Sequence, residues 1–166
     1  MAKWNIRDIA YCGVIAALYA VLTVALAPIS YGVYQVRVSE ALTILPFLYA
    51  PSMLALFIGC LVANIFGGFG IQDIVLGSLI TLVAGYATYL ISRLKSKRLA
   101  MSLAPLPPVI FNAFGVAAYL YKITGMSYLF VAQMIGIGEL IACYLLGLPL
   151  LIILNSRKSL FHIHTG

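Results

Sequence analysis

The stretch MSYLFVAQMIGIGELIACYLLGLPLLII, residues 126–153, decides the class of fold. It exceeds the roughly 20 apolar residues that a helix needs to cross a bilayer, and its one charged side chain is Glu139. A carboxylate at this depth is unfavourable by about 3 kcal/mol or more unless it faces a polar cavity or a partner. A substrate, a proton or a basic side chain on a neighbouring helix would each meet that requirement.

The composition extends this reading to the whole chain. Of its 166 residues, 64% are hydrophobic and only 8% are charged, and the mean hydropathy is +1.10. Soluble domains carry about 25% charged residues, and strands of membrane β-barrels alternate apolar and polar residues, whereas the apolar runs here are continuous. We therefore expect an all-α integral membrane protein, with one transmembrane domain over residues 1–166 and six transmembrane helices in a compact bundle.

The expected spans and the basic residues together predict an orientation. The spans are expected at residues 9–27, 37–49, 52–66, 73–92, 103–121 and 128–153. With six crossings, one side receives Lys3, Arg7, the segment Arg93–Arg98, Arg157 and Lys158. The positive-inside rule makes that side the cytoplasm, so we expect both termini there. The net charge of +6 thus reports orientation, and we expect no nucleic acid as a partner.

Polar side chains concentrate in the outer half of the expected bundle. Residues predicted near the outer ends of their helices are Arg37, Glu40, Asn64 and Asp73, and those predicted deeper are Asn112 and Glu139. A proton relay would place acids through the whole thickness of the membrane. The pattern instead favours a cavity open to the outside.

Gly136 and Gly138 precede the buried acid within its helix. Each glycine destabilises a helix interior by roughly 1 kcal/mol relative to alanine, which is explained if a ligand or another helix approaches the backbone there. Two interpretations of Glu139 remain. It accepts hydrogen bonds from a ligand with adjacent N–H donors, or it forms a buried ion pair, for instance with Arg37.

Other polar and aromatic residues also have two interpretations each. Arg37 and Glu40 are three residues apart, a spacing that permits pairing, or they contact a ligand. Asp73 either caps the start of its helix or binds a ligand. Tyr34 and Phe69 either stack on a planar ligand or belong to the aromatic belt at the membrane interface.

Small residues form a stripe along the first expected helix. They are Ala10, Gly13, Ala16, Ala17 and Ala20, and such spacing permits close helix–helix approach in lipid. The stripe serves either packing within the bundle or docking of a partner subunit.

Motifs for independent chemistry are missing from the sequence. It has no phosphate-binding Gly-rich loop with Lys, no His-Glu-x-x-His and no Gly-x-Ser-x-Gly. The three cysteines have no metal-type spacing. We expect no metal, no cofactor and no enzyme activity, and without a detectable inverted repeat the chain is a poor stand-alone transporter.

Four segments resemble the QueT family. They are VRVSEALTILPF (Val36–Phe47), GCLVANIFGGFGIQDIVLGSLITLVAGY (Gly59–Tyr86), APLPPVIFNAF (Ala104–Phe114) and GIGELIACYLLGLPL (Gly136–Leu150). Members of this family are regarded as substrate-binding S-components of energy-coupling-factor (ECF) transporters that import queuosine precursors. The resemblance covers most of the chain up to about Asn155.

The resemblance implies a set of partners and a location. It implies a multi-pass subunit of a prokaryotic cell membrane that works with a transmembrane coupling protein (T-component) and two cytosolic ATPase subunits. The family's Ala-x-x-x-Ala docking pattern falls on Ala16 and Ala20, with Gly13 in the same stripe. The implied ligands are 7-deazaguanines, namely preQ0, preQ1 or queuine.

Given the ligands that the resemblance implies, chemistry and placement lead to hypotheses for particular residues. Glu139 would accept a ring N–H and the exocyclic amine of a guanine-like edge as a bidentate pair, and Asn112 would read the neighbouring carbonyl or ring nitrogen. Tyr34 or Phe69 would stack on the ring, and Asp73 or Glu40 would meet the aminomethyl group of preQ1. The full expected binding set is Glu139, Asn112, Asp73, Arg37, Glu40, Tyr34, Asn64 and Phe69.

Alternatives remain beside the S-component for deazaguanines. One is an S-component for a different vitamin or nucleobase. An intramembrane enzyme lacks a nucleophile–base pair, and a structural subunit without a ligand leaves Glu139, Asp73 and Asn112 unexplained. Copurification with a coupling protein and ATPases separates the S-component hypotheses from the other two.

Overall fold

The computed structural model describes residues 5–157. Lys3 and Lys158, two of the basic residues from which the orientation was predicted, lie outside the described part. In chain order its elements are α1 (Ile6–Ala25), α2 (Ala27–Ser30), η1 (Val38–Phe47), α3 (Ser52–Gly67), η2 (Asp73–Gly77), α4 (Ser78–Ile91), α5 (Lys97–Leu103), α6 (Leu106–Thr124), α7 (Tyr128–Leu140), η3 (Ile141–Gly147) and α8 (Leu148–Ser156). All regular structure within residues 5–157 is helical. The all-helical class is therefore confirmed.

The number of spanning helices differs from the prediction. The described residues form seven helical stretches when η2 is joined to α4, α5 to α6, and α7 to α8 through η3. Four of these stretches are long and apolar enough to cross a membrane: Ile6–Ala25, Asp73–Ile91, Lys97–Thr124 and Tyr128–Ser156. The other two predicted spans correspond to the shorter apolar helices Val38–Phe47 and Ser52–Gly67. Length and hydropathy thus show a multi-pass helical protein with four candidate spans, not six.

The predicted span at residues 37–49 is the clearest difference. Its helix, η1, is a 3-10 helix of 10 residues, which at about 2.0 Å per residue is roughly 20 Å long. The hydrocarbon core of a bilayer is about 30 Å thick, so η1 by itself does not cross it. Apolar composition indicated a buried helix correctly but did not indicate its type.

Local sequence explains where several helices begin and end. Asn5 and Asp8 form a reciprocal cap at the start of α1, in which the Asn5 N–H donates to Asp8 Oδ2 at 3.0 Å. Ser127 caps α7 by accepting a hydrogen bond from the Phe130 N–H. Helices α3 and α6 end at Gly68 and Gly125, whose φ angles of +76° and +71° favour glycine.

Two π-helical segments interrupt the long helices. Segment η2 opens the helix that continues as α4, and η3 joins α7 to α8. Pro149 supplies a reason for η3, because it has no N–H and its ring would clash with the carbonyl four residues earlier in an α-helix. Such segments often occur at functional sites.

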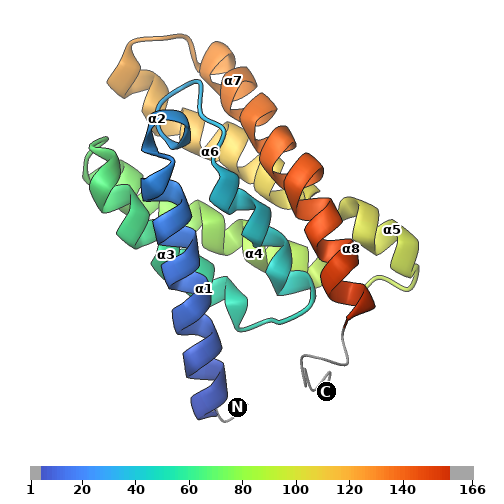
Figure 1. The fold of residues 1–166 in the computed structure, drawn as a ribbon. Helices are drawn as coiled ribbons and strands as arrows, with labels where there is room; N and C mark the ends of the chain where they lie inside the picture. Colours follow the sequence, from blue (N-terminus) through green and yellow to red (C-terminus); the bar gives the residue numbers. More distant parts are fainter. Residues whose placement is uncertain (1–4, 158–166) are drawn as a thin grey trace.

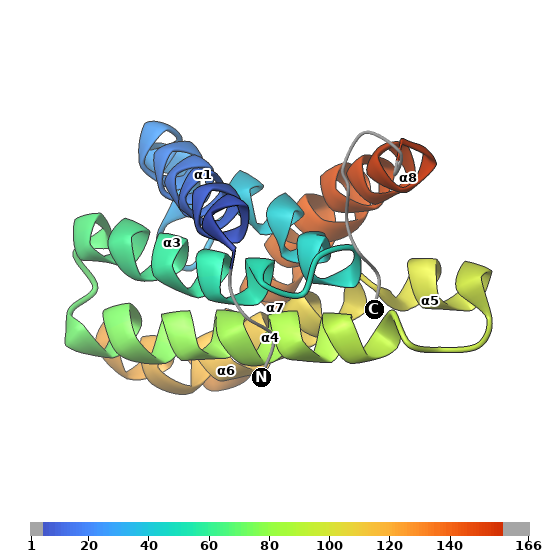
Figure 2. The same ribbon diagram turned by 90° about the horizontal axis from the view of Figure 1, so that it is seen from below.

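The helices surround η1. Helix α1 packs on α3, α3 on α4, α4 on α6 and α6 on α7, while η1 contacts α1, α3, α4, η3 and α8. Figure 2 shows the pair α4 and α6 below, with α1 and α8 on the opposite side and η1 between them. The first turn of α1 and the last turn of α8 lie towards the same end of the molecule (Figure 1). The segment of η1 is therefore the centre of the bundle.

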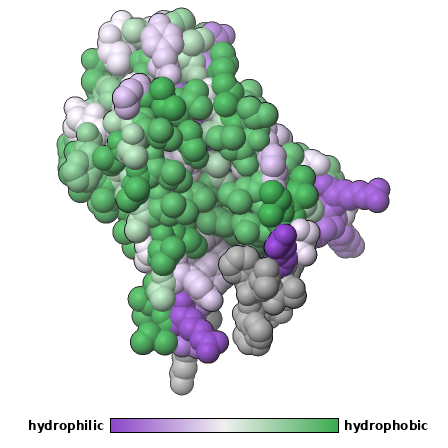
Figure 3. Space-filling model, viewed as in Figure 1, coloured by the Kyte–Doolittle hydropathy of each residue, from purple (hydrophilic) through white to green (hydrophobic). Residues whose placement is uncertain are grey.

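The outer surface is largely apolar. Figure 3 shows hydrophobic residues over most of the face formed by α1, η1 and α7, with hydrophilic side chains gathered at the lower and right edges. Exposed basic residues are Arg7, Arg93, Lys95, Lys97, Arg98, Lys122 and Arg157. An apolar belt with charges at its ends is the surface expected of a protein embedded in lipid.

Candidate functional site

Three buried acids lie on or beside the irregular helical segments. Glu40 lies in η1, Asp73 begins η2, and Glu139 lies two residues before the start of η3 at Ile141. Their exposed fractions are 1%, 5% and 4%. Bundle topology brings these three segments together, although they are up to about a hundred residues apart in sequence. Unpaired carboxyl groups in such an interior are expected only where a function requires them.

Glu139 lies in the central polar cluster, which comprises Arg37, Glu40, Asn112 and Glu139. Its Oε2 accepts a hydrogen bond from the Cys143 thiol at 3.5 Å. The amide of Asn112 lies beside the carboxyl groups of both Glu40 and Glu139. Two acids and an amide therefore converge here. The sequence placed Glu139 and Asn112 deep in the bundle and Glu40 near the outer end of its helix, and all three belong to the expected binding set, which stays a prediction.

Glu40 is held in place by its neighbours. The Tyr19 hydroxyl of α1 donates to Glu40 Oε1, and Thr43 Oγ1 donates to the Glu40 backbone carbonyl at 2.6 Å. The Cys143 thiol also lies 3.6 Å from that carbonyl. Glu40 Oε2 is buried and has no hydrogen-bond partner in the described part of the chain. One side of this carboxylate is thus fixed and the other is open to a donor.

Arg37 does not form the ion pair considered from the sequence. Its guanidinium donates to the Ser30 carbonyl at 3.3 Å, to Gln35 Oε1 at 3.4 Å and to Cys60 Sγ at 3.8 Å. No carboxylate is among its hydrogen-bond partners within residues 5–157. It nevertheless lies within electrostatic range of Glu40, Glu139 and Asp73. The cation therefore influences all three acids without neutralising any of them through direct contact.

Asp73 belongs to a second polar cluster, which adjoins the first through Arg37. The Tyr119 hydroxyl donates to Asp73 Oδ1 at 2.6 Å, and the Asn64 amide nitrogen donates to the Asp73 backbone carbonyl at 2.9 Å. Asp73 thus receives a side-chain hydrogen bond from α6, and the interpretation that it merely caps its own helix does not describe this contact. Asp73 Oδ2 and Asn64 Oδ1 are buried without a hydrogen-bond partner among the described residues.

Close packing explains why residue 138, one of the two glycines before Glu139, has no side chain. A Cβ atom at this position would overlap the backbone carbonyl of Gln35. At Gly136 the nearest atom to such a Cβ would be Ala113 Cβ, at 3.4 Å. The close approach expected at this helix is therefore made by the chain's own loop of residues 31–37, which bears Arg37.

The aromatic residues expected to stack on a ligand occupy different surroundings. Tyr34 is 68% exposed, and its ring makes an edge-to-face contact with Phe130 at a centroid distance of 6.1 Å. Phe69 is half-buried and packs against the apolar core between α6 and α7. Tyr34 is therefore the ring with freedom to move onto a ligand.

The small residues of α1 are divided between internal packing and an open surface. A Cβ at Gly59 of α3 would lie 2.7 Å from the Ala16 carbonyl, so Ala16 lies against α3. Gly13 is exposed and a Cβ there would contact nothing within 4 Å, and Ala20 is half-buried. A groove of about 310 Å³ between α1 and α3 is lined by Gly13 and Ala16 among others.

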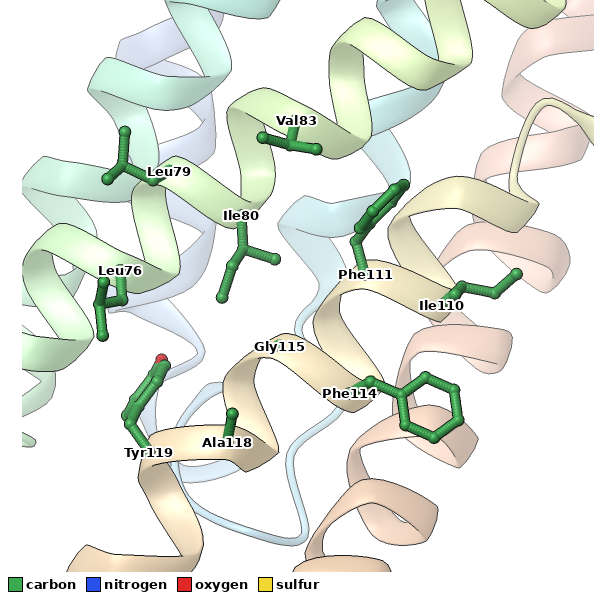
Figure 4. A pocket seen from close by; sticks show the side chains of 10 residues that line it. All are labelled: Leu76, Leu79, Ile80, Val83, Ile110, Phe111, Phe114, Gly115, Ala118 and Tyr119. Carbon is green, nitrogen blue, oxygen red and sulfur yellow. The ribbon is translucent and has the colours of Figure 1, made fainter.

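A larger cavity, of about 570 Å³, lies between α4 and α6. Figure 4 shows that its lining side chains are aliphatic or aromatic, and that the hydroxyl of Tyr119 points towards η2 near Leu76. That hydroxyl already donates to Asp73. The cavity therefore offers no free polar group to a hydrophilic ligand, and the buried polar clusters are the better candidate site.

Several residues of the clusters were not singled out from the sequence. They are Tyr19, Gln35, Cys60, Cys143 and Tyr119. All five are buried, and the two cysteines contact polar groups, although Cys60 also packs in an apolar cluster with Leu42 and Leu56. The only available signal was a tyrosine within an apolar helix, which is equally typical of membrane-interface residues. Within residues 5–157 no three His, Cys, Asp or Glu side chains are placed to hold a metal ion.

Comparison with known proteins gives the family. The family described as QueT transporter matches residues 9–156. The queuosine precursor transporter QueT of Lactococcus lactis subsp. cremoris (strain MG1363) is 41% identical over 85 residues, which are 50% of this chain and 50% of that protein. The match thus spans about half the length of this curated relative, and no solved structure matches the chain. Because the family match covers most of the chain, the protein belongs to the QueT transporter family.

Proposed function

We propose that the chain is the substrate-binding S-component of an ECF-type importer and that it captures a queuosine precursor from outside the cell. The ligand class is the 7-deazaguanines: preQ0, preQ1 or queuine. Support comes from membership of a transporter family and from the relative whose name is queuosine precursor transporter. The observation that carries the proposal is the convergence of Glu139, Glu40 and Asn112 in the interior of a membrane protein.

The central polar cluster suits the edge of a guanine-like base. Such an edge presents a ring N–H beside an exocyclic amine, and one carboxylate accepts from both in a charge-assisted pair. Glu139 has one oxygen bonded only to a thiol, which is a weak donor that a ligand readily replaces. Asn112, beside both acids, has donors for the base carbonyl. Glu139 therefore accepts hydrogen bonds from the ring N–H and the exocyclic amine, and Asn112 donates to the adjacent carbonyl of the base.

Access to the cluster requires movement of the loop of residues 31–37. Glu40, Asn112 and Glu139 are nearly fully buried in this structure, whereas Tyr34 at the crest of the loop is exposed. We place the entrance at this loop, with Tyr34 closing over the bound base. This arrangement is consistent with a cavity that opens to the outside.

The proposal includes an orientation of the protein in the cell membrane. The first turn of α1 and the last turn of α8 lie at one end of the bundle (Figure 1), as any even number of crossings, including the four candidate spans, requires. We assign that end, with the basic segment Arg93–Arg98, to the cytoplasm of a prokaryotic cell.

The proposed partners are a transmembrane coupling protein and two cytosolic ATPases. The docking surface is the exposed part of α1 at Gly13, with Ala16 at the groove between α1 and α3 and the half-buried Ala20 one turn further along α1. Gly13→Leu fills this surface without meeting the chain's own atoms at Cβ. We expect it to abolish copurification with the coupling protein while ligand affinity stays within about twofold of wild type. Retained copurification would place docking elsewhere.

The decisive experiment is a binding titration of the purified protein in detergent. The panel holds preQ0, preQ1 and queuine, with guanine and thiamine as controls, and the protein is tested as wild type, Glu139→Gln and Gln133→Ala. Gln133 is exposed on the same helix. We expect a deazaguanine to bind tightest and Glu139→Gln to weaken it about 10- to 100-fold, as loss of a charged hydrogen-bond pair predicts, with Gln133→Ala unchanged.

Two results would contradict the proposal. Unchanged affinity in folded Glu139→Gln removes Glu139 from the site. Absence of binding by every deazaguanine in folded wild-type protein removes the ligand class, and leaves an S-component for another vitamin or nucleobase as the alternative.

A further inference from the structure

The buried polar clusters have more acceptors than donors. Glu40 Oε2, Asp73 Oδ2 and Asn64 Oδ1 are buried and have no hydrogen-bond partner within residues 5–157. Their residues are 1%, 5% and 1% exposed. A buried polar atom without a partner is strongly unfavourable and rare in native proteins. Ser30 Oγ, beside Arg37, is also buried without a partner, but a hydroxyl both donates and accepts. The carboxylate oxygens of Glu40 and Asp73 only accept, so we expect their donors from outside the chain.

The charges in this region are also unbalanced. Three carboxyl groups, those of Glu40, Asp73 and Glu139, lie within electrostatic range of the Arg37 guanidinium. Arg37 directs its N–H groups to a carbonyl, an amide and a thiol sulfur. Carboxylates in a medium of low dielectric constant strongly favour a nearby cation. The region is therefore complementary to a ligand that is itself positively charged.

Asp73 provides a defined place for that charge. Its Oδ1 is occupied by the Tyr119 hydroxyl, so Oδ2 is the free oxygen. A Cβ at Gly67 would lie 3.6 Å from Oδ2 and 2.8 Å from the Tyr31 ring, which shows that the carboxylate, the ring and a residue without a side chain adjoin one another. The face of an aromatic ring attracts a cation, and the Arg37 guanidinium lies over the Tyr31 ring at 5.6 Å from its centroid. The free oxygen of Asp73 is therefore the group left to receive the ammonium of a ligand.

The candidate ligands differ in the group that would meet Asp73. PreQ0 carries a nitrile, which is neutral and only accepts hydrogen bonds, whereas preQ1 carries an aminomethyl group that is a cation with three N–H donors, and queuine carries a secondary ammonium. Building on the proposed function, we infer that the site selects the cationic deazaguanines over the nitrile, with Asp73 Oδ2 receiving the ammonium group. Glu139 and Asn112 then bind the guanine edge, and Asp73 determines which substituent is accepted.

Competition binding in detergent tests this selection. Wild-type protein is titrated with preQ1, with preQ0 and with the uncharged 7-hydroxymethyl analogue of similar size, and the series is repeated with Asp73→Asn and Glu40→Gln. Asparagine keeps an oxygen for the Tyr119 hydroxyl but removes the charge. We expect wild type to favour preQ1 over preQ0 by about tenfold or more. Asp73→Asn loses this preference because its preQ1 affinity falls by a larger factor than its preQ0 affinity, whereas Glu40→Gln changes all three affinities by a similar factor.

The outcomes separate this inference from the proposed function. Equal or tighter binding of preQ0, or a preference that persists in Asp73→Asn, overturns the role of Asp73 and leaves the deazaguanine transporter standing. Failure of all three compounds to bind folded wild-type protein overturns both. If Asp73→Asn does not fold, the wild-type comparison of preQ1 with the hydroxymethyl analogue decides, because the two differ mainly in charge.

Discussion

Replacing Gly138 by alanine tests the contact between α7 and the loop of residues 31–37. The new Cβ would overlap the Gln35 carbonyl, and a backbone carbonyl cannot rotate away as a side chain does. Alanine gains about 0.5–1 kcal/mol of helix stability relative to glycine, but overpacking costs typically 1–3 kcal/mol, occasionally more. The loop must therefore shift, and Arg37 shifts with it.

Gly136→Ala is the matched control on the same helix. Its Cβ would meet only Ala113 Cβ at 3.4 Å, so the helix-propensity gain should remain. Thermal unfolding in detergent should place Gly138→Ala about 3–8 °C below wild type, because 1 kcal/mol shifts the midpoint by roughly 2–4 °C for a chain of this size. Gly136→Ala should equal wild type or exceed it by a few degrees.

Ligand titration adds a second measurement on the same two proteins. Displacing the loop should weaken binding in Gly138→Ala by about tenfold, since one misplaced charged contact contributes on this scale, whereas Gly136→Ala should bind as wild type does. The reasoning is refuted if both variants show the same midpoint and the same affinity, since the loop would then not depend on the absence of a side chain at Gly138.

Three further substitutions test other contacts. Tyr119→Phe leaves Asp73 Oδ1 buried without its donor, and should lower stability by about 1–3 kcal/mol in thermal unfolding; an unchanged midpoint would contradict that bond. Gly59→Ala should separate α1 from α3, because its Cβ lies 2.7 Å from the Ala16 carbonyl, and the midpoint should fall by several degrees, equivalent to about 1–3 kcal/mol. Tyr34→Ala should change stability by less than about 0.5 kcal/mol because the ring is 68% exposed, yet weaken ligand binding severalfold, as loss of a stacked ring predicts; equal affinity would remove Tyr34 from the site.

Much of the fold class and the family was predictable from local sequence. Long apolar runs with few charges specify helices in a membrane, because hydropathy is summed residue by residue and needs no knowledge of the fold. The resemblance of four segments to the QueT family is confirmed by a match over residues 9–156. A lone acid such as Glu139 in an apolar helix indicates a functional interior position for the same local reason.

The types of the helical segments were not predictable in the same way. Residues 38–47 read as an α-helical span but form a 3-10 helix, and two stretches of the longer helices are π-helical. The four candidate spans and the shorter helices Val38–Phe47 and Ser52–Gly67 are all apolar, so hydropathy cannot distinguish a central helix from a lipid-facing one. The contacts of η1 with five other elements determine its position.

The sequence by itself determined that the chain is a helical membrane protein of the QueT family with acids in its interior, and it proposed the binding residues, which stay predictions. Only the tertiary structure decided which groups meet. Cys143 and Glu40 are 103 positions apart yet in contact, Arg37 bonds to a carbonyl, an amide and a thiol in place of an acid, and Gly138 faces the Gln35 carbonyl. The physical reason is that hydrogen bonding and steric fit act over a few ångströms between specific atoms, and only packing of all the helices brings those atoms within range.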